Sequence, residues 1–100
     1  MPYRVPPYGM SHTIKHQAKL LARIRRMKGQ MEAIETALLA EKPCEDIMNL
    51  TASVRGALTG LMAELIEEHI REHVVAEGLD SSDRNKGAED LIEVIRSYLK

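Results

Sequence analysis

The sequence predicts an all-α protein with three helices in each protomer. Aromatic residues make up only 3% of the 100-residue chain, and Phe and Trp are absent, so the core must consist of aliphatic side chains, most of which favour helices. Apolar residues recur at helical spacing, and no segment alternates as a strand would. A chain of this length suffices for one domain but buries limited surface alone, which favours an oligomer.

The first predicted helix spans about 11–40, after an arm over 1–9 that contains three prolines and is expected to be flexible. Ser11 or Thr13 can cap its start, and Pro43 disfavours helical backbone at Lys42. The apolar residues of this helix follow 4-3-4-3-4 spacing, the pattern of a helix that pairs with another helix. They are Leu20, Ile24, Met27, Met31, Ile34 and Leu38.

The second predicted helix spans about 44–77, with two acids in its first turn, where the helix dipole favours them. At this length it would measure roughly 50 Å, so only an elongated bundle shared between subunits can cover its apolar stripe. Gly56 and Gly60 would let another helix approach closely, and Gly78 is the expected C-cap. A polar loop over 80–87 and a third helix over about 88–99 complete a single domain expected over 10–100.

Charge is distributed unevenly although the net charge is only −1. Residues 1–30 contain seven Lys or Arg and no acid, whereas residues 31–100 carry a net charge of −8. Lys15, Lys19, Arg23 and Arg26 recur at intervals of 4, 4 and 3, so they form a stripe on the first helix. Such a stripe suits contact with phosphates, although a solvated helix face is the simpler interpretation of many charge clusters.

The single cysteine excludes an intrachain disulfide and favours a cytoplasmic location. No apolar run approaches the roughly 20 residues that a membrane-spanning helix needs, and no signal peptide is expected at the start.

The histidines and the cysteine suggest a transition-metal site. His69 and His73 are four residues apart, so both rings leave one face of the second helix. Cys44 precedes His69 by 25 residues, about 37 Å along an unbroken helix. An antiparallel dimer would bring Cys44 of one protomer to the histidines of its partner, and His12 on a flexible arm could close the site.

Two other interpretations compete with a metal sensor. His69, Glu72 and His73 fit the H-x-x-E-H pattern of some metalloproteases, but the chain offers no strand to bind a substrate and almost no aromatic lining, so no enzyme is predicted. Alternatively, the chain is a helical interaction module whose histidines and cysteine are incidental.

Taken together, these residues resemble the CsoR/RcnR family of metal-sensing repressors. The resemblance extends from Met10 to Lys100. It is carried by the segments MSHTI at 10–14, LARIRRMKGQ at 21–30, VRGALTGLM at 54–62 and SYLK at 97–100, together with Cys44, His69 and His73.

This resemblance implies a three-helix protomer that forms an antiparallel dimer and then a disc-shaped dimer of dimers. It implies a repressor of a metal efflux system that binds a G-tract operator with flanking inverted repeats. The basic run would supply the DNA contacts, here Arg23, Arg25, Arg26 and Lys28, with Arg55 from the second helix and Lys15 and Lys19 nearby.

Members of the family differ in their ligands. Copper sensors resemble Cys-His-Cys, but His73 stands at the third position here. Nickel and cobalt sensors resemble His-Cys-His-His, which matches His12, Cys44, His69 and His73. We therefore expect Ni(II) or Co(II) as the regulatory ligand. Formaldehyde sensors of the same fold react through a cysteine, so a formaldehyde response through Cys44 is the alternative, whereas persulfide sensors need a second cysteine.

The N-terminus departs from the nickel and cobalt regulators, in which the Ser-His-Thr segment follows the initiator Met. Nine residues precede Met10 here. If Met10 is a usable start, His12 would be third from a free amine, an arrangement that chelates nickel well.

Overall fold

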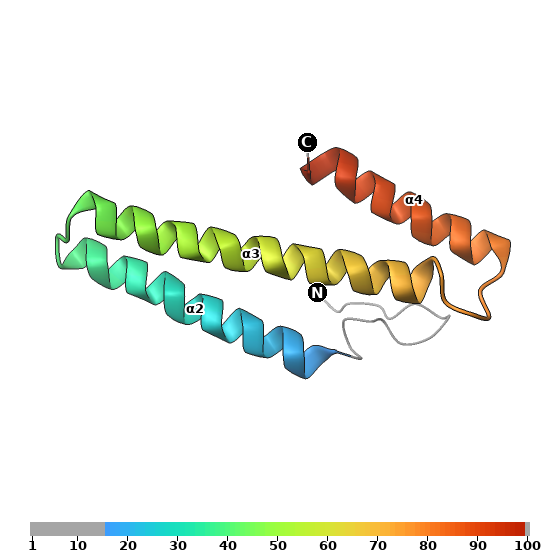
Figure 1. Cartoon of the computed structure of the whole chain (residues 1–100), viewed down its shortest axis with the longest axis horizontal. Coiled ribbons are helices and arrows are strands. Elements are labelled where there is room, and N and C mark those ends of the chain that lie inside the picture. Colours follow the sequence, from blue (N-terminus) through green and yellow to red (C-terminus); the bar gives the residue numbers. More distant parts are fainter. Residues whose placement is uncertain (1–15, 100) are drawn as a thin grey trace, which may run out of the picture. The chain divides into compact units, whose positions relative to one another are not determined.

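The computed structural model describes residues 16–99, which form three helices and, within that range, no strand (Figure 1). These are α2 (Gln17–Leu39), α3 (Cys44–His73) and α4 (Ser81–Tyr98). The predicted all-α fold with three helices is therefore confirmed. The expected flexible arm over 1–9 and the predicted caps Ser11 and Thr13 lie outside the described residues. The predicted start of the first helix near Ser11 is wrong, because α2 begins at Gln17 and His16 before it is not helical. In the described part of the chain, no helix is long and apolar enough to cross a membrane.

The helices fall into two compact units, each described by itself. The first unit, His16–Ala63, contains α2 and the first part of α3, which run antiparallel after a short connection (Figure 1). Met27, Ala37 and Val54 are its buried apolar side chains. Small and medium-sized aliphatic residues thus form the contact between the two helices, as the lack of Phe and Trp requires.

The predicted apolar seam of α2 is only partly covered by this contact. Met27 is buried, but the side chains of Met31 and Leu38 remain 55% and 57% exposed. A groove of about 470 Å³ runs between α2 and α3 beside Met31. Its lining consists of Ile24, Met27, Lys28, Met31, Glu32, Val54 and Leu58. One protomer therefore leaves uncovered an apolar face that the sequence pattern assigns to helix pairing.

The connection between α2 and α3 ends α2 by donating backbone hydrogen bonds to its last carbonyls. Lys42 N–H donates to the Ala37 carbonyl at 3.0 Å, and Glu41 N–H donates to the Leu38 carbonyl at 3.1 Å. These two bonds are those of a Schellman motif. The helix therefore ends at Leu39 because its last carbonyls bond to the turn, three residues before the steric effect of Pro43 applies.

Glu41 occupies the left-handed position of this motif, with φ of 54°, where glycine is usual. A side chain there costs of order 1 kcal/mol or more. We expect Glu41→Gly to raise the free energy of unfolding by about 0.5–1 kcal/mol, because part of this gain is offset by the flexibility of glycine in the unfolded chain. Urea denaturation at fixed protein concentration measures the change. Lys42→Gly, at the neighbouring position, should destabilise the protein, and a loss of stability in Glu41→Gly would contradict the assignment.

The second unit, over 64–99 in the described range, contains the last part of α3 and all of α4. Here two boundaries predicted from sequence are wrong. The second helix ends at His73 instead of about Glu77, and the third begins at Ser81 instead of about Ala88. Gly78, the predicted C-cap, has φ of 87° and lies in the turn between the helices, beyond the end of α3.

The supposed polar loop over 80–87 is helical because its first residues form an N-cap. The Asp80 carboxylate accepts the Asp83 N–H at 2.8 Å, which satisfies one of the free donors of the first turn. Arg84 then donates to the carbonyls of Val74 at 2.8 Å and Leu79 at 2.9 Å. By binding the chain just beyond α3, Arg84 stabilises the turn that ends the helix early.

Candidate metal centre and basic surface

The two histidines predicted as ligands lie in the last two turns of α3. Their ring centroids are 5.0 Å apart and the ring planes are tilted by 43°. Both residues are half-buried. The prediction that the four-residue spacing places both imidazoles on one face is confirmed, and the two rings lie side by side.

Both histidines also contact α4. The His69 Nε2 atom lies 2.8 Å from the Gly87 carbonyl oxygen. The backbone of His73 packs against Gly87, the buried residue of α4. A cavity of about 20 Å³ adjoins this contact, lined by His73, Leu79, Asp83, Lys86 and Gly87. The candidate ligands are thus held between two helices of the same unit.

The environment of His73 lowers its pKa. Burial of the ring is the main cause, and the positive charge of His69 adds to it, whereas Glu72 and Asp90 act in the opposite direction. The lowered pKa of His73 favours its neutral imidazole, which is the form that binds a metal ion.

This lowered pKa gives a dependence of stability on pH. The unfolded chain has an ordinary histidine pKa near 6.5, so below that value the unfolded state binds the proton more readily than the folded state. We expect the free energy of unfolding of the metal-free protein to fall as the pH drops from above 6.5 through the pKa of folded His73. His73→Gln should reduce this fall, as measured by urea denaturation with a chelator present. A midpoint above 6.5 for His73 in an NMR titration would contradict the prediction.

Cys44 is the first residue of α3 and is exposed. Glu45 and Asp46 follow it in the first turn. The thiol is therefore accessible to a metal ion, to an electrophile or to another protomer. The remaining predicted ligand, His12, lies outside the described residues.

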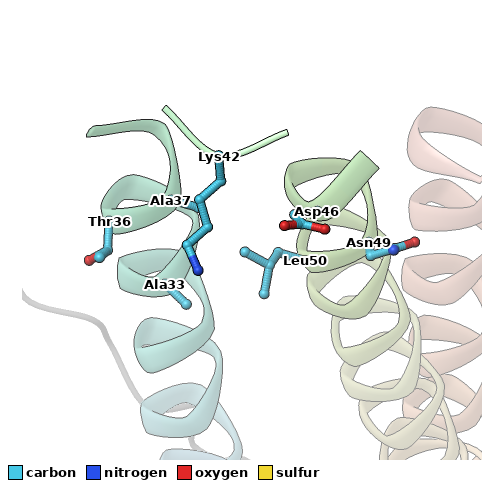
Figure 2. Close-up of a pocket in the computed structure, with 7 residues that line it drawn as sticks. All are labelled: Ala33, Thr36, Ala37, Lys42, Asp46, Asn49 and Leu50. Carbon is cyan, nitrogen blue, oxygen red and sulfur yellow. The ribbon is translucent and has the colours of Figure 1, made fainter. Parts of the chain in front are cut away.

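A pocket of about 600 Å³ lies between α2 and α3 beside Lys42 of their connection. Its lining is Ala33, Thr36, Ala37, Lys42, Asp46, Asn49 and Leu50. Figure 2 shows the Lys42 side chain extending from the connecting loop into the space between the helices. This lining contains neither an imidazole nor a thiol, so the pocket is separate from the predicted metal ligands.

The predicted DNA-contacting residues lie on two sides of the α2–α3 pair. Arg23 and Arg26 line one depression of about 450 Å³, whereas Lys28 lines the apolar groove. The Arg23 guanidinium lies over Gly60, where a Cβ atom would be 2.9 Å from its Nη1. The predicted close approach at Gly60 is thus made by a side chain of α2. Lys19, Arg25 and Arg55 are exposed, and Lys15 lies outside the described residues.

Sequence reasoning missed the residues that attach α4 to the histidines. Asp80, Arg84 and Gly87 all fell within the supposed loop, so no role was assigned to them. The signal for Asp80 was present, because aspartate is a favoured N-cap residue and an acid in the first turn, here Asp83, also marks a helix start. No comparable local signal marks Gly87, whose role depends on a residue 14 positions earlier.

A basic helix combined with paired imidazoles and an accessible thiol is the combination expected of a metal-responsive protein that binds nucleic acid. The chain belongs to the family of metal-sensitive transcriptional repressors, which matches residues 16–97. The resemblance found in the sequence is thereby confirmed. Members of this family are regulators of transcription, and nothing in the described residues indicates catalysis.

Three similar proteins support this assignment. An uncharacterized protein in the bioA 5′ region of Serratia marcescens is 48% identical over 91 residues, which are 91% of this chain and all of that protein. The transcriptional repressor RcnR of Salmonella arizonae (strain ATCC BAA-731 / CDC346-86 / RSK2980) is 37% identical over 91 residues, with the same coverage. A solved structure of a single-substitution variant of the formaldehyde-responsive regulator FrmR from Salmonella enterica serovar Typhimurium is also similar. It is 35% identical, with a TM-score of 0.79 over 88% of this chain and 99% of that one.

Proposed function

We propose that this protein is a nickel- and cobalt-responsive repressor. It binds operator DNA without metal and releases it when Ni(II) or Co(II) binds, which derepresses a metal efflux system. The observation that carries the proposal is the side-by-side placement of His69 and His73, with ring centroids 5.0 Å apart, in a chain that also presents an accessible thiol at Cys44.

The donor types favour these metals. Imidazole nitrogen suits nickel and other divalent first-row metals, whereas Cu(I) prefers soft thiolates. The chain has one thiol and four histidines, and His73 stands where a copper sensor is expected to have a second cysteine. His12 would complete a His-Cys-His-His set with Cys44, His69 and His73.

A site shared between protomers fits the helix that carries these ligands. α3 is continuous from Cys44 to His73, so its helical rise keeps Cys44 away from the histidines of the same protomer. A shared site would take Cys44 from one protomer and the histidines from its partner. Pairing with a second protomer would bury the exposed apolar groove beside Met31. We propose the antiparallel dimer, assembled further into a dimer of dimers, as the working form.

Operator binding is proposed for the basic residues of α2. Arg and Lys side chains contact phosphates and fix the register of the protein, while DNA shape supplies much of the specificity of such an interface. A G-tract with flanking inverted repeats is the proposed target. Metal and DNA binding are then coupled by linkage, and the metal weakens DNA binding as much as DNA weakens metal binding.

A formaldehyde response through Cys44 is the second candidate. The similarity to the FrmR structure and the exposure of Cys44 favour it. In this alternative the fold and the DNA contacts are the same, and the inducer reacts with the thiol instead of binding to the imidazoles.

Fluorescence anisotropy of a labelled G-tract duplex distinguishes these functions. Reduced, metal-free protein is bound to the duplex and titrated in parallel with Ni(II), Co(II), Cu(I), Zn(II) and formaldehyde. We expect release by Ni(II) or Co(II). Release by formaldehyde alone would establish the second candidate, release by Cu(I) alone would overturn the metal assignment, and failure to bind the duplex would contradict both functions.

A further inference from the structure

Gly87 permits an unusually close contact between α4 and the last turn of α3. It is the buried residue of α4. A Cβ atom at this position would overlap the carbonyl oxygen of His73 and would lie 2.8 Å from its carbonyl carbon and 3.0 Å from its Cβ. The nearest obstacle is backbone, which cannot rotate away as a flexible side chain can. Only glycine therefore fits while α4 keeps this position.

The same residue supplies a hydrogen-bond acceptor to His69. The Gly87 carbonyl oxygen is 2.8 Å from His69 Nε2. Because a carbonyl can only accept, Nε2 must carry the proton and donate it. In the neutral ring the lone pair then resides on Nδ1, so Nδ1 is the nitrogen that can act as a metal ligand. Histidines that bind metals commonly donate their other ring N–H to a backbone carbonyl or a carboxylate, which fixes the tautomer and the orientation of the ring.

We propose that Gly87 is a positioning residue of the metal site. Its missing side chain allows α4 to approach His73, and its carbonyl oxygen orients His69 as an Nδ1 donor. The inference rests on the proposed metal-sensing function and adds a residue to it. The contact of Gly87 with the end of α3 thus sets both the position of α4 and the orientation of the His69 ring. Arg84 stabilises this contact by binding the turn that leads into α4.

The tautomer of His69 in the metal-free wild-type protein tests the geometric half of this proposal. Long-range ¹H–¹⁵N correlation NMR at pH 8, with a chelator present, distinguishes a ring protonated at Nε2 from one protonated at Nδ1. We expect the Nε2–H tautomer for His69. A predominant Nδ1–H tautomer would overturn the proposal, and this measurement requires no variant to fold.

Gly87→Ala tests the functional half, with Asn85→Ala as its control. Asn85 is an exposed residue of α4, and both substitutions introduce alanine, which favours helix. Alanine at position 87 should nevertheless destabilise the protein, because its methyl group meets the His73 backbone. We expect Gly87→Ala to bind Co(II) about 10–100-fold more weakly than wild type with altered Co(II) absorption bands, whereas Asn85→Ala should retain both properties.

The outcomes separate this inference from the proposed function. If wild type binds neither Co(II) nor Ni(II), the nickel and cobalt function fails, and the metal role of Gly87 fails with it. If wild type binds Co(II) and a folded Gly87→Ala, checked by circular dichroism, binds it equally well with the same spectrum, only the role of Gly87 is overturned. If Gly87→Ala does not fold, the wild-type tautomer decides the proposal.

Discussion

Replacing His73 with Ala is expected to abolish the release of operator DNA by Ni(II) and Co(II). The substitution removes one of two adjacent imidazole donors and leaves the thiol at Cys44 in place. Couplings between an effector and a second ligand typically change affinity about 5–150-fold, and the variant should lose that entire change. The fold should survive, because the contact with Gly87 involves mainly the backbone of His73, together with a Cβ atom that alanine retains.

The measurement is anisotropy of the labelled operator duplex with and without saturating metal. Arg71→Ala is the matched control in the same turn of α3, since Arg71 is exposed and pairs with Glu67 at 2.8 Å on the surface. The control should respond to metal like wild type. If His73→Ala still released DNA fully with Ni(II), the metal site would lie elsewhere. If His73→Ala no longer released DNA with metal but still released it with formaldehyde, Cys44 would mediate a formaldehyde response that does not need His73.

Replacing Arg23 with Ala is expected to weaken operator binding at least tenfold at moderate ionic strength. The side chain belongs to the basic stripe of α2, and its guanidinium lies over Gly60, which supports it beside Arg26 in the same depression. Each phosphate contact that is lost should also reduce the slope of log affinity against log salt concentration by about one. Titrations of the duplex at several salt concentrations measure both effects.

Two basic residues serve as controls for Arg23. Lys28 lies on the apolar groove at the other side of the α2–α3 pair, and Arg96 is an exposed residue of α4. Lys28→Ala should weaken binding less than Arg23→Ala, and Arg96→Ala should leave the salt slope unchanged. Equal losses in all three variants would mean that net charge, and not this surface, governs DNA binding.

Much of the fold followed from local patterns. The helical periodicity around Met27 predicted α2, and the acids Glu45 and Asp46 marked the start of α3. The four-residue spacing of His69 and His73 predicted two rings on one face, because helical geometry alone decides that relation. Residue types and spacing also suggested the metal ligands and the basic stripe, and the family resemblance added nickel or cobalt and operator DNA as expectations. Of these residues, Lys15 and His12 lie outside the described residues.

The errors occurred where local and tertiary effects compete. The segment 80–87 is polar and contains Gly87, so composition suggested a loop, but the Asp80 cap and the anchoring of Arg84 make it helical. The predicted seam of α2 is not an error but is divided in one protomer, because α3 covers Met27 and leaves Met31 and Leu38 exposed. Sequence spacing shows which residues share a face but not how much of that face a single neighbour covers.

The sequence by itself determined the helical class, the pairing of the two imidazoles and the separation of basic from acidic segments. These properties depend on residue type and on intervals of a few positions, which a helix converts directly into geometry. Only the tertiary structure decided that α4 begins at Ser81, that Arg23 lies over Gly60 and that Gly87 contacts His69 and His73. The contacts of Arg23 and Gly87 join residues 14 or more positions apart and depend on a close approach of helices that no short pattern encodes. The start of α4 combines the local Asp80 cap with the hydrogen bond from Arg84 to Val74.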